Sequence, residues 1–168
     1  MKIKESAKAQ LNGFERMLHW IPGFKGYFER ELRRDSDRLQ REFVVEKLRT
    51  VKNGLTEVVR DVSRQKKLDL LTAYDEFARL LERDINEIRY ADRGYTGFFD
   101  LIKIREAELD AVYQADAELA DMVVQFGELF RKLATHPEDS SLLPDMRNAL
   151  KSIGDKFRTR SERLKGYQ

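Results

Sequence analysis

The sequence predicts an all-α protein: an antiparallel four-helix bundle of coiled-coil-like hairpins, with one long helix and an extra amphipathic helix at the N-terminus. Three observations predict this fold. Apolar residues recur at alternating spacings of three and four along most of the 168 residues, which is the period of one helix face. Only 3 prolines interrupt the chain. The charged fraction of 37%, against an average of about 25%, is typical of long solvated helices with narrow apolar stripes.

Residues 2–21 are predicted to form an amphipathic helix that ends before Pro22, because the residue preceding a proline is pushed out of helical geometry. We divide the chain here into an N-terminal helix, 1–21, and a single bundle domain, 22–168. Two interpretations of the helix remain open: its apolar stripe packs on the bundle, or it lies in a membrane interface. The candidate membrane face consists of Leu11, Phe14, Leu18, Trp20 and Ile21.

A long helix is predicted from about residue 26 to residue 67, with no proline inside it. Its stripe shifts by one residue near the middle, as expected when a straight helix drifts against a seven-residue repeat. Asn53-Gly54 is a turn signal, but the stripe runs through it in phase, so we expect the helix to continue. The stripe comprises Phe28, Leu32, Leu39, Phe43, Val44, Leu48, Val51, Leu55, Val58 and Val62.

Three shorter helices follow in the predicted order. Asp69 is a candidate N-cap for a helix at about 70–91, and the short connection predicts a hairpin with the long helix. Residues 106–133 carry the most regular stripe, in which Asp116 occupies a core position. After a loop at 136–141, Pro144 opens the last helix. In that helix Arg160 and Ser161 stand where the stripe lacks an apolar residue.

Charge is distributed unevenly along the chain. Residues 1–67 carry 17 basic and 10 acidic side chains, whereas residues 68–144 carry 8 and 17, and residues 145–168 carry 7 and 3. A basic surface of this kind can bind an anionic partner. We favour the alternative that basic and acidic helices lie side by side and neutralise each other. Interspersed acids along the arginine-rich stretch 30–42 make nucleic acid an unlikely partner.

Several kinds of chemistry find no support in the sequence. The chain has no cysteine, so thiol nucleophiles and thiolate metal sites are excluded. Its only histidines, His19 and His136, do not form the Glu-x-x-His pairs of di-iron bundles. Phosphate-binding glycine motifs are absent, as is an apolar stretch long enough to span a membrane. We therefore predict no catalytic residue, no metal and no cofactor, and a cytoplasmic protein, with a peripheral position at the membrane as the alternative.

Asp116 is the polar residue that breaks a strong apolar stripe. Burying a carboxylate is costly unless it is paired, and Arg34, Arg38 and Arg41 on the long helix are candidate partners. We interpret Asp116 as half of a buried ion pair that sets helix register. The alternative is a functional carboxylate in a pocket, which would need further polar groups converging nearby.

Two glycine–aromatic segments, residues 23–29 and 94–100, share the order glycine, aromatic, any residue, glycine, aromatic, Phe, acid. Both precede a predicted helix, and we expect their rings to close one end of the bundle. A small-ligand or enzyme site at this corner is the less favoured alternative. The corner residues are Phe24, Tyr27, Phe28, Tyr95, Phe98 and Phe99.

These two motifs, Ile-Pro-Gly-Phe-Lys-Gly-Tyr at 21–27 and Arg-Gly-Tyr-Thr-Gly-Phe-Phe-Asp at 93–100, resemble those of a group of uncharacterised small bacterial helical proteins. The resemblance covers residues 21–165. It implies an all-helical fold but transfers no activity and no functional residue.

The sequence thus favours a non-enzymatic helical interaction or scaffold protein, which binds a protein partner or a second copy of itself. Peripheral membrane association through residues 2–21 is the alternative.

Overall fold

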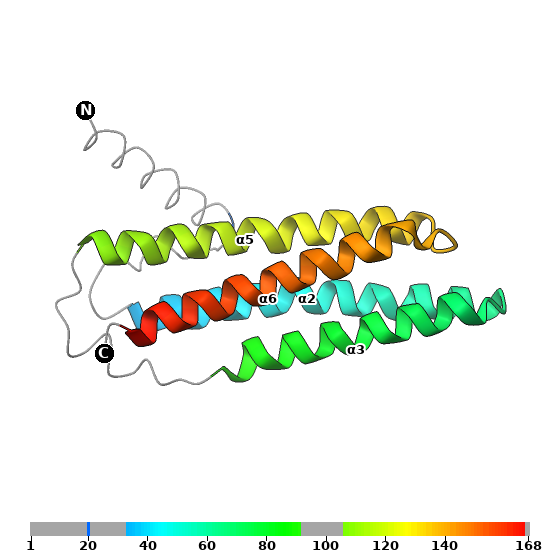
Figure 1. The fold of residues 1–168 in the computed structure, drawn as a ribbon, viewed down its shortest axis with the longest axis horizontal. Coiled ribbons are helices and arrows are strands. Elements are labelled where there is room, and N and C mark those ends of the chain that lie inside the picture. The colour runs from blue at the N-terminus through cyan, green and yellow to red at the C-terminus, as the bar shows by residue number, and fades with distance from the viewer. Residues whose placement is uncertain (1–19, 21–32, 92–105, 167–168) are drawn as a thin grey trace, which may run out of the picture. The chain divides into compact units, whose positions relative to one another are not determined.

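The computed structural model describes residue 20 and residues 33–91 and 106–166. The prediction of an all-α fold is confirmed: the described residues form four α-helices and a short 3-10 helix, without strands (Figure 1). The elements are α2 (Arg33–Arg64), α3 (Leu68–Tyr90), α5 (Glu106–Thr135), η4 (Ser140–Leu142) and α6 (Leu143–Gly166).

The chain groups into two compact units. Unit 1 comprises residues 1–43, 92–121 and 156–168, and unit 2 comprises residues 44–91 and 122–155. Helices α2, α5 and α6 therefore contribute residues to both units, whereas α3 belongs to unit 2. The predicted boundary after residue 21 falls outside the described residues.

Unit 2 has an apolar core supplied by all four helices. The largest side chains that are fully buried in it include Tyr74, Phe77 and Phe126, and the rings of Phe77 and Phe126 lie 6.3 Å apart between centroids. The stripe positions predicted on α2 are buried from residue 43 to residue 62. The three-four spacing of apolar residues therefore identified the core face of the helix correctly.

Helix α2 passes through Asn53-Gly54 without a break, as predicted. The reason for glycine at this position is contact with another helix. A Cβ atom added to Gly54 would lie 2.5 Å from Cε1 of Phe130 on α5, well inside van der Waals contact. Gly54 therefore gives the Phe130 ring room to pack against the backbone of α2.

The turn between α2 and α3 differs from the prediction that Asp69 caps α3. Helix α3 begins at Leu68, so Asp69 lies inside its first turn, where a carboxylate complements the helix dipole. Lys67 occupies the N-cap position without a side-chain capping hydrogen bond. Its neighbour Lys66 adopts a positive φ of 58° and donates its backbone N–H to the carbonyl of Ser63 over 3.0 Å. This left-handed residue reverses the chain.

Replacing Lys66 by glycine is expected to raise the free energy of unfolding by about 1 kcal/mol. The left-handed conformation costs a residue with a Cβ roughly 1–2 kcal/mol, and glycine avoids this cost. Glycine also loses more backbone entropy on folding, which offsets part of the gain. Urea denaturation measures the change. Lys66→Ala is the matched control, since it removes the same charge but keeps the Cβ. Equal stabilisation by alanine and glycine would show that charge, not backbone strain, governs this turn.

Ion pairs join neighbouring helices within unit 2. Lys52 on α2 contacts Glu82 on α3 at 2.7 Å, and Arg147 on α6 contacts Glu76 on α3 at 3.1 Å. Arg147 also donates to the backbone carbonyl of Ala73 over 3.3 Å. Acidic side chains of α3 thus pair with basic ones on both neighbours, which agrees with the interpretation of mutual neutralisation. Because these pairs are partly exposed, each is worth at most about 1 kcal/mol.

The loop between α5 and α6 is held by two polar contacts. The hydroxyl of Tyr74 donates to the carbonyl of Pro137 over 2.9 Å. Burial, together with the charges of Asp139 and Glu138, raises the pKa of that hydroxyl. The carboxylate of Asp139 accepts the backbone N–H of Ser141 over 2.9 Å, and this hydrogen bond lowers the pKa of Asp139. Pro144 follows as the second residue of α6, in the predicted first turn.

Candidate functional site

The buried polar residues are concentrated in unit 1. Among the described residues, four polar or charged side chains are buried, and three of them, Gln40, Asp116 and Arg160, belong to unit 1. They come from α2, α5 and α6 respectively, and their exposed fractions are 0%, 3% and 4%. We call these three residues the polar cluster.

The centre of the polar cluster is an ion pair between Asp116 and Arg160. The guanidinium donates from Nε to Oδ1 of the carboxylate and from Nη2 to Oδ2, the second bond measuring 3.3 Å. A planar guanidinium that bonds both oxygens of a carboxylate is the strongest geometry for such a pair. Alanines occupy the neighbouring buried positions 115, 117 and 120, and their small side chains leave space on α5 for the long arginine.

The structure shows a partner of Asp116 that the sequence analysis did not name. Arg38 has an exposed side chain and pairs at 3.6 Å with Glu42, one turn further along the same helix. Arg34 lies in α2, but its side chain is outside the described part. Asp116 pairs with Arg160, whose place in α6 interrupts the apolar stripe just as Asp116 interrupts the stripe of α5. Opposite charges at the interrupted positions of the two stripes are the sequence signal that could have identified this pair.

Gln40 is a member of the polar cluster that sequence reasoning missed. Its Nε2 donates to the backbone carbonyl of Asp116 over 2.9 Å. Its Oε1 is buried and has no hydrogen-bond partner in the structure as described. Extending the stripe of Val44, Leu48 and Val51 back by one turn reaches Gln40. That extension was obscured by the one-residue shift of the stripe in this region.

A second, more exposed ion pair lies between the same two helices. Lys156 on α6 contacts Glu118 on α5, and Gln114 donates to the other oxygen of Glu118 over 3.0 Å. The side chains of Lys156 and Glu118 are 32% and 40% exposed. Solvent therefore screens this pair much more than the buried pair of Asp116 and Arg160.

The arrangement of the polar cluster favours a structural role over a catalytic one. The carboxylate of Asp116 is engaged by Arg160 through both oxygens, so its charge is compensated within the protein. Each of the three residues comes from a different helix, which means that a shift of one helix by a single turn would break the contacts. The polar cluster therefore joins α2, α5 and α6 in unit 1 through hydrogen bonds that depend on how these helices are aligned.

Of the candidate membrane face, the structure describes Trp20. Its indole N–H donates to Oδ1 of Asp121 on α5 over 3.0 Å, and the ring is half-buried. The remaining members of that face, Leu11, Phe14, Leu18 and Ile21, lie outside the described residues. The same holds for the six predicted corner residues, Phe24, Tyr27, Phe28, Tyr95, Phe98 and Phe99.

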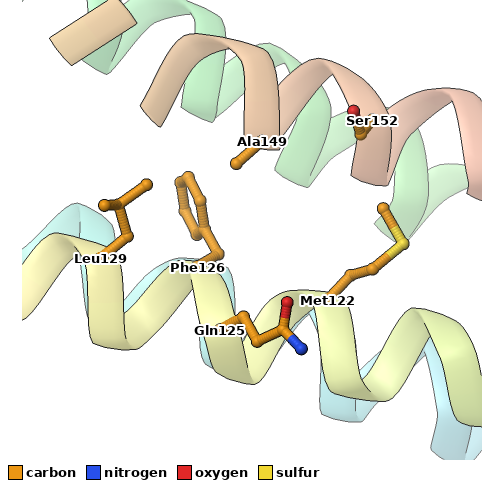
Figure 2. Close-up of a pocket in the computed structure, with 6 residues that line it drawn as sticks. All are labelled: Met122, Gln125, Phe126, Leu129, Ala149 and Ser152. Atoms are coloured by element: carbon orange, nitrogen blue, oxygen red, sulfur yellow. The ribbon is translucent and has the colours of Figure 1, made fainter. Parts of the chain in front are cut away.

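A shallow apolar groove lies between α5 and α6 in unit 2 (Figure 2). Its volume is about 280 Å³, slightly below the range of about 300–1,000 Å³ typical of pockets for drug-sized ligands. Phe126 is fully buried at its base, and Met122 and Leu129 are half-exposed beside it. The lining residues are Met122, Gln125, Phe126, Leu129, Ala149 and Ser152.

Within the described ranges, no group of three or more His, Cys, Asp or Glu side chains is arranged to hold a metal ion. None of the described helices is long and apolar enough to cross a membrane. The fold and these sites define an all-α helical-bundle protein with a buried ion pair and a surface groove. Comparison of the chain with protein-family models, curated proteins and solved structures finds no match.

Proposed function

We propose that the protein is a non-enzymatic helical interaction protein, which binds a second copy of itself or another protein in the cytoplasm. The groove between α5 and α6 is the observation that carries this proposal. Its base and one wall are apolar, and it is lined by residues one helical turn apart on two neighbouring helices. Such a groove suits the apolar face of a partner helix, whose side chains anchor at three- and four-residue spacing.

The other described sites support the same proposal. The buried charges of unit 1 are paired with each other, and the cross-helix ion pairs of unit 2 serve to hold its helices together. Half-exposed Met122 is flexible and polarisable, and side chains of this type adapt well to the surface of a partner.

Replacing Leu129 by glutamate is expected to abolish partner binding, because it places a charge against the apolar base of the groove. The measurement is recovery of partners by the tagged full-length chain from its native cell, including an untagged second copy of itself. Gln125→Glu is the matched control: it adds the same charge at an exposed position on the groove rim, and we expect recovery to persist. Circular dichroism confirms that both variants keep their helix content. If all three chains recover the same partners, the groove is not the contact.

Peripheral membrane association through residues 2–21 is the alternative proposal, and the contact of Trp20 bears on it. The indole N–H that would face lipid headgroups is already bound to Asp121, so membrane insertion of this residue must first break that hydrogen bond. Vesicle flotation of the full chain against a chain that starts at Pro22 tests the alternative. Equal binding by the two chains would reject residues 2–21 as an anchor.

A further inference from the structure

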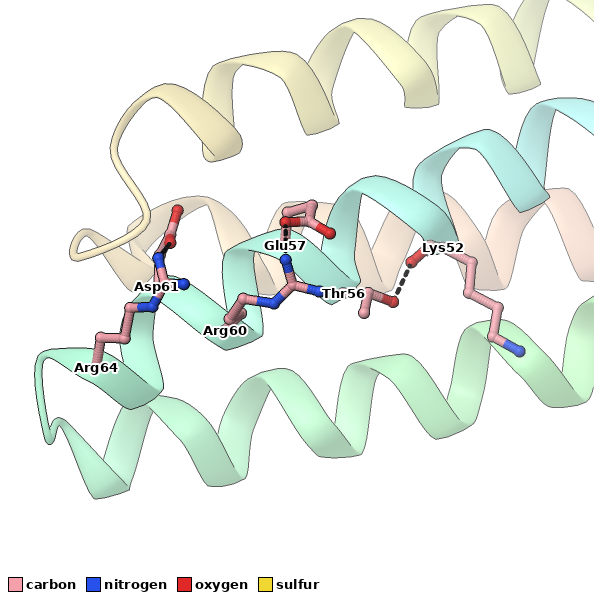
Figure 3. Close-up of polar contacts among 6 residues, drawn as sticks. All are labelled: Lys52, Thr56, Glu57, Arg60, Asp61 and Arg64. Carbon is pink, nitrogen blue, oxygen red and sulfur yellow. Dashed lines mark hydrogen bonds and ion pairs between the residues drawn. The ribbon is translucent and has the colours of Figure 1, made fainter.

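The turn between α2 and α3 forms an exposed apex, which we define as residues 64–71. Its first four residues include three basic side chains, Arg64, Lys66 and Lys67. Along α2, Arg60 pairs with Glu57 at 2.8 Å and Arg64 with Asp61 at 3.5 Å, so these charges are compensated locally (Figure 3). Lys66 and Lys67 are exposed, and neither has an ion-pair partner in the part of the chain that the structure describes. Within the described ranges, the apex therefore presents two positive charges that no ion pair compensates.

Leucines follow directly after these lysines. Leu68 is 72% exposed, one of two large apolar side chains exposed to this extent among the described residues. Leu70 and Leu71 are half-exposed in the same first turn of α3. A leucine this exposed at the tip of a hairpin gains nothing for folding, and it lies next to the two free cations.

The backbone of the apex is strained at Lys66, which holds a φ of 58°. Glycine is the usual residue at such a left-handed position after a helix, because it has no Cβ. A strained backbone conformation that is kept at an exposed residue points to a function for the side chain of that residue. The strained residue is Lys66, whose ammonium group is one of the two positive charges defined above.

We propose that the apex is a contact surface for anionic lipid headgroups, with Lys66 and Lys67 at the phosphates and Leu68 entering the interface between headgroups and acyl chains. This surface is separate from the α5–α6 groove, and the proposal goes beyond partner binding. A bilayer fits the apex better than a protein does. A stable protein interface needs about 800 Å² and 20–30 residues from each partner, whereas the apex offers eight residues on a sharp turn.

Nearby acids set the strength of this contact. Asp69 lies within the apex, and the hydrogen bond from Tyr74 to Pro137 holds the loop bearing Glu138 and Asp139 against α3. These carboxylates repel anionic lipids, so we expect weak, reversible binding that is lost as salt shortens the range of the attraction.

Co-sedimentation of the full chain with vesicles tests the proposal, using phosphatidylcholine alone and phosphatidylcholine with about 30% phosphatidylserine as a source of negative surface potential. We expect binding to the anionic vesicles only, and loss of that binding at high salt. Lys66→Ser is expected to weaken binding about fivefold, the effect of one charge near the membrane surface. Leu68→Ser is expected to weaken it about tenfold through lost apolar burial.

Two matched controls separate the apex from the rest of the chain. Lys132→Ser removes an exposed lysine on α5, and Tyr90→Ser removes the other large exposed apolar side chain; both variants should bind as the wild type does. Absence of binding to anionic vesicles would overturn the proposal. Equal loss of binding in Lys66→Ser and Lys132→Ser would also overturn it, because the effect would then be one of net charge. Undiminished binding in both apex variants would overturn it too, because the contact would then belong to another segment. None of these outcomes depends on whether a protein binds the groove.

Discussion

Replacing Arg160 by methionine is expected to lower the free energy of unfolding by roughly 3–5 kcal/mol. The substitution removes the guanidinium that pairs with the carboxylate of Asp116, a side chain that is 3% exposed. Asp116→Leu is expected to cost a similar amount, because it removes the carboxylate that pairs with the buried guanidinium of Arg160. Urea denaturation followed by circular dichroism measures both changes. This is the largest effect that we expect from a single substitution in the polar cluster.

The double variant Asp116→Leu with Arg160→Met separates the pair from its parts. Apolar side chains of similar size can replace a buried ion pair at little or no cost, so we expect the double variant to recover most of the stability lost in either single variant. Lys156→Met is the control on the same two helices: its half-exposed pair with Glu118 should cost no more than about 1 kcal/mol. If the two single losses simply add, the two residues do not act as a pair.

Gly54→Ala is expected to destabilise the protein by roughly 1–2 kcal/mol, whereas Gly127→Ala is expected to stabilise it by about 1 kcal/mol. Both glycines lie inside helices, where alanine is favoured by about 1 kcal/mol. A Cβ at position 127 meets nothing within 4 Å, but a Cβ at position 54 lies 2.5 Å from the Phe130 ring. Because Phe130 is buried, we expect overpacking, which costs roughly 1–3 kcal/mol, to exceed the gain in propensity.

Urea denaturation of the two glycine variants checks this contrast. Adding Phe130→Leu to Gly54→Ala removes the ring atoms that clash with the new Cβ. We therefore expect Phe130→Leu to cost less stability in the Gly54→Ala variant than in the wild type. Stabilisation by Gly54→Ala alone would show that the ring moves aside freely, and the close approach of α2 to Phe130 would then not require glycine.

The helices were predictable because their apolar stripes follow the helical period directly. From Phe43 to Val62 on α2, the predicted core residues are buried. Such positions are set by the burial of apolar area, which acts on each helix regardless of its partner. The turn before α3 was less predictable, because the chain reverses through a lysine in a conformation that usually requires glycine.

Partners across the core were harder to predict than the core positions themselves. The stripe marked Asp116 as a buried carboxylate. Which arginine pairs with it depends on which helices are neighbours and on which of their residues lie at the same level along the bundle axis. Arg160 occupies a core position of α6, and an arginine there can only be accommodated beside an acid. Gly54 likewise appeared to be a tolerated glycine, because nothing local in the sequence indicates that Phe130 packs against it.

The molar mass of the purified full-length chain, measured by light scattering over a range of concentrations, tests the proposed interaction function most directly. If the groove binds a second copy, the mass rises with concentration above that of one chain, and Leu129→Glu returns it to the single-chain value while Gln125→Glu does not. A single-chain mass at every concentration, from a protein that also recovers no partner from its native cell, would contradict the proposal.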